Sequence, residues 1–367
     1  GKYEYYTRFV ALVSWLVPTL RFMIHRNKAD EKRILAIWDF SKDPFTVGDF
    51  LTFQELTLIL AIKHNVNKVD MIWLYHPDKF RIDGGLNRNN YHYYLSNQLP
   101  LVHINQRLGS FMLMDSEDML ASYIAGNHHR YYVIPPYKND DKTLIHNYWT
   151  YFNNIYKFYE DYGYIPHLSC SPSILSWTRI LIDKIVDNNI PVVVQLRNAK
   201  NTLGRNAKIN CWFDFFVNCE NKYDVTFIMI GNKNQLDDRF RKLTNVVFSK
   251  DYGTTVEQDL ALIQSCCLFV GTTSGPANMA LFGKVPYIIY NMQLIHTKLS
   301  RGKQHPFASP LQKIIWKPET TKMLIDEFEM LISKIDTKEW MKNFNDQLSE
   351  DHLVLERINP ENVENAT

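Results

Sequence analysis

The sequence predicts an α/β protein made of two successive domains, each with helices packed on a parallel sheet, followed by a helical tail. The chain has 367 residues, a length that suits two domains of ordinary size. Hydrophobic residues make up 46% of it and charged residues 22%, the balance of a globular protein rather than of a disordered or fibrous one. Short apolar runs also alternate with segments of helical periodicity along both halves of the chain.

The first half opens with a strand, a helix and a second strand. Residues 34–40 (ILAIWDF) and 69–75 (VDMIWLY) are apolar runs typical of buried strands, and residues 49–64 between them have apolar side chains at near-helical spacing. This order is a βαβ unit. Further strands are expected at residues 101–105 and 131–135, a surface insertion at 87–97 and a helix at 141–162.

The second half repeats the alternation more regularly. Strands are expected at residues 190–196, 225–230, 245–248, 267–270 and 285–290, the last closing the sheet, and helices at 209–219, 256–265 and 275–282. Two such halves are Rossmann-like domains, and ligands of such sheets bind beyond the carboxyl ends of the strands, so we expect the active site in the cleft between the halves. The expected units are an N-terminal helical segment (1–30), a first domain (31–165), a second domain (166–318) and C-terminal helices (319–367), with a linker at 164–173.

Charge and cysteine usage exclude several classes of function. The 41 Lys and Arg against 39 Asp and Glu leave a net charge of +2, too small for a general nucleic-acid binder. The five cysteines include no Cys-x-x-Cys pair, which argues against a structural zinc site and a disulfide framework and predicts free thiols in a reducing compartment. A cytoplasmic protein is therefore expected.

One segment raises the question of membrane contact. No stretch reaches the ~18–20 apolar residues that a membrane span requires. Residues 9–20 (FVALVSWLVPTL), flanked by Arg8 and Arg21, are interpreted either as a helix packed on the protein body or as an interfacial helix on an anionic membrane. The second interpretation would make the protein peripheral at the inner face of the membrane.

Anion-binding chemistry is predicted at the strand ends of the second half. Arg197 and Arg205 follow the strand at 190–196, and arginine can bind phosphate oxygens through two nitrogen atoms, although two surface arginines are the alternative. The turn at 271–276 (GTTSGP) joins a strand to a helix, where small residues admit a ligand and helix N–H groups bind anions. The candidate binding residues here are Arg197, Asn198, Arg205, Thr272, Thr273, Ser274 and Gly275.

Neighbouring strand ends would complete the predicted pocket. Thr254 and Glu257 have the T-x-x-E spacing of a capping box, so Thr254 is predicted to cap the helix that follows. The other strand ends lie where a nucleoside base and ribose are expected. The candidates in this region are Gly231, Lys250, Asp251, Thr254, Thr255 and Glu257.

The first half offers one main catalytic candidate. Asp49 follows Gly48 at a predicted helix start, where a carboxylate is favoured by the helix dipole and would also be placed to act as a general base in the cleft. Asp39 and Asp43 are rivals in the same loop region. Candidates for contact with a second substrate are His103, for which a structural role is the alternative, and His128 and Arg130.

These motifs resemble those of the lipopolysaccharide heptosyltransferases. Residues 256–290 are similar to the donor-site stretch of that family, and residues 48–52 (GDFLT) are similar to its G-D-V/I-L-x-T motif. Two positions depart from the pattern: Thr273 stands where the family typically has Asp, and Asn278 where it typically has His. The strand end at Arg197 is also similar to the H-x-R element of GDP-fucose-using enzymes, with Gln195 in place of His.

The resemblance implies a GT-B fold, in which two Rossmann-like domains face each other across a cleft. It implies a glycosyltransferase with Asp49 as catalytic base, a nucleotide sugar held mainly by the second domain, and no essential metal or other cofactor. The expected partners are the nucleotide sugar and a polysaccharide or glycolipid acceptor, with no nucleic acid. A single displacement would invert the anomeric carbon. The alternatives are a nucleotide-sugar epimerase and a non-catalytic transferase-like domain that binds glycans or scaffolds a complex.

Overall fold

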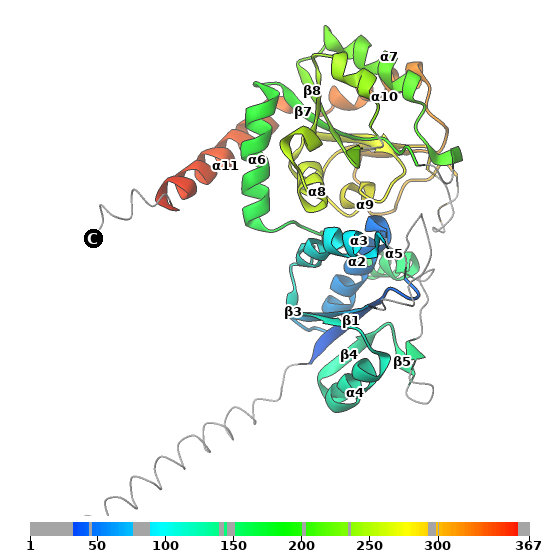
Figure 1. Cartoon of the computed structure of the whole chain (residues 1–367). Helices are drawn as coiled ribbons and strands as arrows, with labels where there is room; N and C mark the ends of the chain where they lie inside the picture. Colours follow the sequence, from blue (N-terminus) through cyan, green and yellow to red (C-terminus); the bar gives the residue numbers. More distant parts are fainter. Residues whose placement is uncertain are drawn as a thin grey trace, which may run out of the picture.

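A computed structural model describes residues 32–43, 46–75, 89–138, 143–144, 151–199, 203–233, 236–292, 299 and 301–358. The chain forms two α/β units, one stacked on the other, with the helix α11 (Thr337–Ile358) extending from the second (Figure 1). The expected N-terminal segment, including residues 9–20, lies outside the described residues. No described helix is long and apolar enough to cross a membrane.

The first unit is built on a parallel sheet with the strand order β3-β2-β1-β4. The side chains of β1 alternate between two cores: Ile34 and Trp38 pack on the face of α2, whereas Leu35 packs with α4 on the other face (Figure 1). The elements are β1 (Arg33–Asp39), α2 (Val47–Lys63), β2 (Val69–Leu74), α3 (Tyr91–Gln98), β3 (Leu108–Met114), α4 (Glu117–Asn127), β4 (Tyr131–Ile134), the short antiparallel pair β5 (Tyr137–Lys138) and β6 (Thr143–Leu144), and α5 (Tyr151–Tyr162).

The second unit is built on a parallel sheet with the order β12-β11-β10-β7-β8-β9. Helices α7 and α10 cover one face, and α6, α8 and α9 lie on the other, toward the first unit (Figure 1). The elements are α6 (Pro172–Val186), β7 (Ile190–Gln195), α7 (Ile209–Glu220), β8 (Val225–Ile230), β9 (Val246–Phe248), α8 (Val256–Ser265), β10 (Leu268–Thr272), α9 (Ala277–Leu281), β11 (Tyr287–Tyr290), β12 (Gln312–Ile315), α10 (Thr321–Ile332) and α11.

The interface between the units is part of a continuous hydrophobic core. One cluster of buried side chains runs from Trp38 and Phe53 of the first unit to Phe282 at the end of α9 and Phe269 of β10. Phe152 of α5 packs against Phe282, with the ring centroids 5.9 Å apart. This shared core fixes how the carboxyl ends of the two sheets face each other.

The expected α/β architecture with a helical tail is confirmed, but several elements differ from the prediction. Residues 101–105 are not a strand: Leu99–Ile104 form a 3-10 helix with Pro100 in its first turn, and proline is unsuited to a sheet ladder. The strand β3, which the sequence pattern missed, is a partly exposed edge strand whose first half is interrupted by Gly109 and Ser110. The strand at 285–290 does not close the sheet, because β12 pairs beyond it.

The helices also differ from the expected pattern in places. Helix α6 follows directly on the expected linker, and the sequence pattern missed it, as it missed α4. The helix expected over residues 141–162 is described only from Tyr151, and Thr143–Leu144 form a strand instead. The chain from Gly163 to Ser171 connects α5 to α6 without regular structure.

Candidate functional site

Two motifs far apart in the sequence touch at the junction of the units. A Cβ atom added to Gly48, at the start of α2, would lie 2.8 Å from the Cα of Gly275, and one added to Gly275 would lie 2.9 Å from the backbone N of Gly48. Such distances exclude any larger side chain at either position unless the backbones move apart. The Gly-Asp motif of the first unit and the small-residue turn of the second therefore form one site.

A side-chain amide links the same two motifs. The Nδ2 group of Asn278 in α9 donates to the backbone oxygen of Gly48 at 2.8 Å and to the Oγ1 of Thr52 at 3.0 Å. The Thr52 hydroxyl also donates to the Gly48 oxygen, at 2.9 Å. Asn278 was noted in the sequence only as a departure from a family pattern; in the structure it bridges the units.

Asp49 lies at this junction, in the first turn of α2. Thr46 caps the helix, with its Oγ1 accepting from the Asp49 backbone N at 3.3 Å, and its hydroxyl donates to the Asp49 carboxylate. The Asp49 side chain is half-buried. Its position at the carboxyl edge of the first sheet is the one that the sequence predicted.

The other two candidate carboxylates, Asp39 and Asp43, form hydrogen bonds within the loop after β1. Asp39 is fully buried and accepts from the backbone N and hydroxyl of Ser41, at 2.9 and 2.6 Å, while Lys42 pairs with it at 3.1 Å. Asp43, also buried, accepts from the backbone N of Asp39 at 2.9 Å. These contacts give both groups a structural role.

Two arginines of the second unit follow the carboxyl end of β7, Arg197 shortly after the strand and Arg205 as the last residue of a short 3-10 helix. Burial lowers the pKa of Arg197, and the nearby charge of Arg205 lowers it further. Burial also lowers the pKa of Arg205, while the negative charge of Asp49 opposes that shift. The Arg205 Nε is buried with no hydrogen-bond partner in the described part of the chain. The three charged groups thus lie close enough to influence one another.

The loop that holds the arginines is braced by its own backbone and by Asn206. The Asn206 side chain accepts from the Ala199 N at 2.9 Å and donates to the Ala199 oxygen at 2.7 Å. The backbone N of Arg197 donates to the Thr272 hydroxyl at 2.9 Å, which ties the end of β7 to β10. Asn198, another predicted ligand residue, lies exposed beside this loop.

The turn after β10 carries two hydroxyl groups, of Thr273 and Ser274, which differ in their hydrogen bonding. The Thr273 hydroxyl donates to the backbone oxygen of Asn291 at 2.9 Å, so it secures the turn to the end of β11. Ser274 is 7% exposed, and its Oγ has no hydrogen-bond partner among the described residues. Of the two hydroxyls, that of Ser274 is the one available to a ligand.

Asp259, which the sequence pattern missed, organises the other strand ends of the second unit. Its buried carboxylate accepts from the Gly231 N at 3.2 Å, the Ser249 hydroxyl at 3.0 Å and the Thr254 hydroxyl at 2.7 Å, and pairs with Lys250 at 2.8 Å. Burial raises the Asp259 pKa, and Lys250 and the hydroxyl donors oppose the shift. The sequence signal for this role was the presence of an acid, Asp259, at the start of the apolar helix segment 259–263 (DLALI).

The capping prediction was wrong by one position. Thr255, not Thr254, caps α8: its Oγ1 accepts from the Gln258 N at 3.2 Å, and the Gln258 side chain accepts from the Thr255 N at 2.8 Å. Each threonine has a suitable capping-box partner three residues later, Glu257 for Thr254 and Gln258 for Thr255. The Thr254 hydroxyl instead donates to the buried Asp259 carboxylate, so it does not cap the helix.

Of the remaining predicted site residues, some lie away from the junction of the two units. Asp251 pairs with Arg241 on the surface, away from the Asp259 network. Glu257 is half-buried at the start of α8; burial raises its pKa, and the charge of His103 in the first unit opposes that shift. The structure does not bring His128 and Arg130 to the cleft, because they precede β4 and lie at the amino edge of a parallel sheet.

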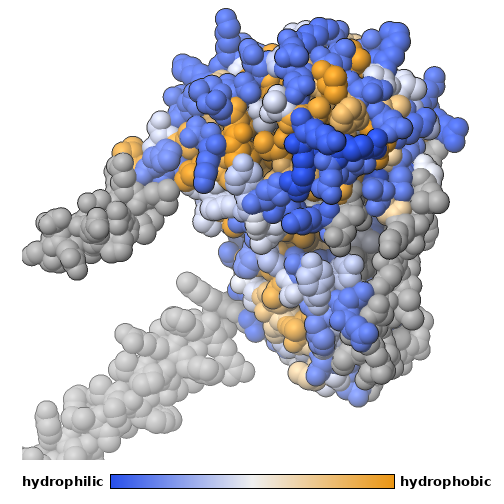
Figure 2. Space-filling view, turned by 45° about the horizontal axis from the view of Figure 1, so that its top comes forward, coloured by the Kyte–Doolittle hydropathy of each residue, from blue (hydrophilic) through white to orange (hydrophobic). Residues whose placement is uncertain are grey.

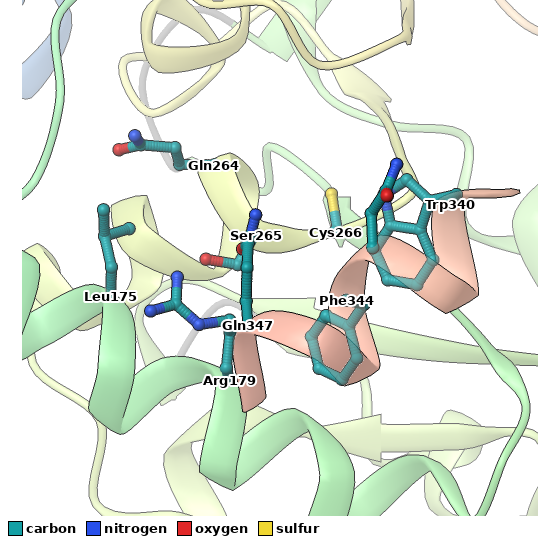
Figure 3. Close-up of a pocket in the computed structure, with 9 residues that line it drawn as sticks. Leu175, Arg179, Gln264, Ser265, Cys266, Trp340, Phe344 and Gln347 are labelled. Carbon is teal, nitrogen blue, oxygen red and sulfur yellow. The ribbon is translucent and has the colours of Figure 1, made fainter. Parts of the chain in front are cut away.

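Other features of the described chain do not form part of this site. No group of three or more His, Cys, Asp or Glu side chains within it could hold a metal ion. A cavity of about 520 Å³ lies between α6, the end of α8 and α11, with Leu175, Trp340 and Phe344 among its lining residues (Figure 3). It reaches Cys266, just before β10, and thus lies at the amino edge of the second sheet. Hydrophilic residues predominate on the face of the molecule in Figure 2.

Neither a family model nor a curated protein matches the sequence. The structure is similar to that of the E. coli ADP-heptose LPS heptosyltransferase II, with a TM-score of 0.56 and 13% identity over 82% of this chain and 99% of that chain. It is also similar to a glycosyl transferase family 9 structure from Veillonella parvula DSM 2008, with a TM-score of 0.50 and 10% identity over 84% and 90% of the two chains. The chain therefore has the two-domain GT-B fold of these transferases, which confirms the fold that the sequence resemblance implied.

Proposed function

We propose that the chain is a glycosyltransferase that moves a sugar from a nucleotide-sugar donor to a polysaccharide or glycolipid acceptor. The observation that carries this proposal is the contact of Gly48, the residue before Asp49, with Gly275, together with the effect of the Asp49 charge on the Arg205 pKa. A carboxylate, paired guanidinium groups and a small-residue turn are the parts that transfer from a sugar diphosphate needs. The likeness to a heptosyltransferase whose name includes ADP-heptose supports a donor of this class.

The second unit would hold the donor phosphates. The buried Nε of Arg205 and the Oγ of Ser274 are polar atoms without hydrogen-bond partners in the described residues, and phosphate oxygens would satisfy both. Arg197, beside Arg205, would share the charge of the leaving diphosphate. The transfer then requires no metal ion for this purpose.

The first unit would supply the base. Asp49 would take the proton of the acceptor hydroxyl while that oxygen forms a bond to the anomeric carbon and the bond from this carbon to the nucleotide phosphate breaks. The proton stays on the Asp49 carboxyl group, and the electron pair leaves with the phosphate. A single displacement of this kind inverts the configuration of the sugar.

The strand ends around Asp259 would bind the nucleoside. Gly231, Lys250 and Thr254 are all held by Asp259, so their arrangement is fixed before a ligand arrives. His103 of the first unit is near enough for its charge to act on Glu257 of the second, and the two would bound the acceptor side of the cleft.

We also propose a cytoplasmic protein with peripheral membrane contact through residues 9–20.

A thermal-shift screen against ADP, GDP, UDP, CMP and their sugar conjugates tests the proposal. A ligand at a hundredfold excess over its Kd stabilises the folded state by about 2.7 kcal/mol, which is readily measured. The shift should disappear in Arg205→Ala and persist in Arg241→Ala, a matched change of an exposed arginine that pairs with Asp251. If no nucleotide shifts the well-folded protein, the non-catalytic alternative is favoured. Conversion of a nucleotide sugar without an acceptor would instead identify an epimerase.

A further inference from the structure

Every strand of the first sheet begins just after a basic residue. Lys32 precedes β1, Lys68 precedes β2, Arg107 precedes β3 and Arg130 precedes β4. Because all pairings in this sheet are parallel, the four residues lie at the same edge, in the order Arg107, Lys68, Lys32, Arg130. With strands about 4.8 Å apart, they form a row of about 14 Å.

The end of α2 brings one further cation, Lys63, to this edge, beside a histidine. Lys63 and His64 end the helix, and the His64 ring stacks on Tyr132 of β4, with the centroids 4.1 Å apart. The Lys32 Nζ lies 4.9 Å from the centre of the Tyr132 ring. Burial together with the charges of Lys63 and Lys32 lowers the His64 pKa, as expected where cations crowd together.

Acidic residues are few in the described part of the amino edge; Asp30 and Glu31, which precede Lys32 in the sequence, lie outside the described residues. The described residues 63–68, 106–109 and 127–132 include no Asp or Glu. Among the described residues at the start of these strands, the acid is Asp70, which is buried, pairs with Arg33 at 3.2 Å and accepts from the Tyr131 hydroxyl at 2.8 Å. Lys32, Lys63, Lys68 and His64 are exposed. In a chain whose net charge is only +2, this edge is a local concentration of cations.

The fold alone does not produce this row. The residues that precede the strands of the second sheet include no Lys or Arg: they are Asn189, Asp224, Asn245, Cys267, Pro286 and Leu311. Both sheets are parallel, and the four strands of the first sheet follow the same order as β9-β8-β7-β10 of the second, so the basic amino edge is a property of the sequence of the first unit.

We propose that the amino edge of the first sheet rests on an anionic phospholipid surface. A flat row of cations suits the headgroups of a bilayer, to which each Lys or Arg near the surface adds attraction. The chain that enters this edge at Lys32 carries the apolar segment 9–20 between Arg8 and Arg21. Stable peripheral attachment generally takes two signals, and the edge supplies the second. This inference rests on the membrane contact already proposed, but not on the sugar-transfer chemistry.

The test is co-sedimentation of the full chain with vesicles of phosphatidylcholine alone and with about 30% phosphatidylglycerol, the anionic lipid. Replacing Lys32, Lys63 and Lys68 together by Gln should lower the partition coefficient on anionic vesicles on the order of 100-fold. The matched control replaces three exposed lysines of the second unit, Lys334, Lys338 and Lys342, and should bind as the unmodified chain does. Added salt should weaken the binding.

Two further measurements make the outcome decisive. If a Leu12→Glu, Leu16→Glu variant abolishes binding while the Lys32, Lys63, Lys68 variant binds normally, only the apolar segment contacts lipid and the proposal is wrong. Binding to heparin in preference to anionic vesicles would also overturn it, in favour of a soluble polyanion. Nucleotide binding should be unchanged in the lysine variant, because these residues lie at the edge opposite the cleft. A loss of nucleotide binding in Arg205→Ala therefore tests the proposed function separately.

Discussion

Both sheets are parallel and share the order of four strands, to which the second sheet adds two more, but their carboxyl ends have opposite chemistry. The first sheet leads into Asp39, Asp43 and Asp49, whereas the second leads into Arg197 and Arg205. In the first unit two of the three acids are buried in loop contacts, and Asp49 alone of them lies at the junction. Under the proposed function, this difference corresponds to a division of roles: the first unit would provide the proton acceptor and the second the anion site.

The largest expected effect comes from replacing the carboxylate of the first unit, Asp49. Asp49→Asn keeps the side-chain shape and its contact with Thr46 but removes the proton acceptor. Since a positioned general base typically contributes ~10²–10⁴-fold, we expect turnover to fall by about that factor with the Kd for the nucleotide sugar little changed. Steady-state kinetics and donor titration measure the two quantities.

Asp115→Asn is the matched control for that experiment. Asp115 follows β3 at the same carboxyl edge of the first sheet and is exposed. Its replacement should leave turnover unchanged, since β3 is an edge strand separated by β2 from β1, the strand that leads into Asp49. Full activity in Asp49→Asn would exclude Asp49 as the base and direct attention to Asp39 and Asp43.

The sequence predicted the parts of the site but not how they meet. Strand-end logic placed Asp49, Arg197, Arg205 and the turn at Gly275 correctly at the carboxyl edges, because a buried strand followed by polar residues is a local pattern. The contact between Gly48 and Gly275 depends on how two units pack, and no periodicity encodes that.

The same limit explains the residues that the sequence misassigned. His128 and Arg130 appeared suited to an acceptor by charge alone, but the edge of a sheet on which a residue lies depends on whether it precedes or follows its strand. Asp259 could not be recognised because its partners come from the ends of two other strands. Local patterns therefore identify elements better than they identify networks.

The second expected effect tests how firmly the basic half is organised. Asp259→Ala leaves Lys250 without its buried partner and frees Gly231 and Thr254. Breaking a buried ion pair typically costs about 3–5 kcal/mol, so chemical denaturation should show a loss of that size in the free energy of unfolding. The exposed pair of Asp251 and Arg241 is the control: Asp251→Ala should cost about 1 kcal/mol or less. Equal losses in the two variants would mean that the Asp259 network is not the structural centre of these loops.

A third change forces the two halves apart. Gly48→Ala adds a methyl group 2.8 Å from the Gly275 Cα, where backbone meets backbone and no side chain can yield. Overpacking of this kind typically costs about 1–3 kcal/mol of folding free energy, and we expect turnover to fall as well because Asp49 moves with Gly48. In Gly126→Ala the new methyl meets nothing within 4 Å in α4, so that variant should be more stable than the unmodified chain by about 0.5–1 kcal/mol. A Gly48→Ala protein as stable and active as the unmodified chain would show that the units do not approach this closely in solution.

The smallest expected effect concerns the amide that joins the halves. Asn278→Ala removes the donor to the Gly48 oxygen and the Thr52 hydroxyl but keeps the glycine contact. Hydrogen bonds of this kind contribute about 0.5–1.5 kcal/mol each, so a loss of about 1–2 kcal/mol in the free energy of unfolding is expected. Thr52→Val removes one acceptor of the same amide, and the effects of the two substitutions should therefore be less than additive in a double-mutant cycle. Strict additivity would mean that Asn278 does not hold the units together through Thr52, and that the shared hydrophobic core alone keeps Asp49 opposite the arginines.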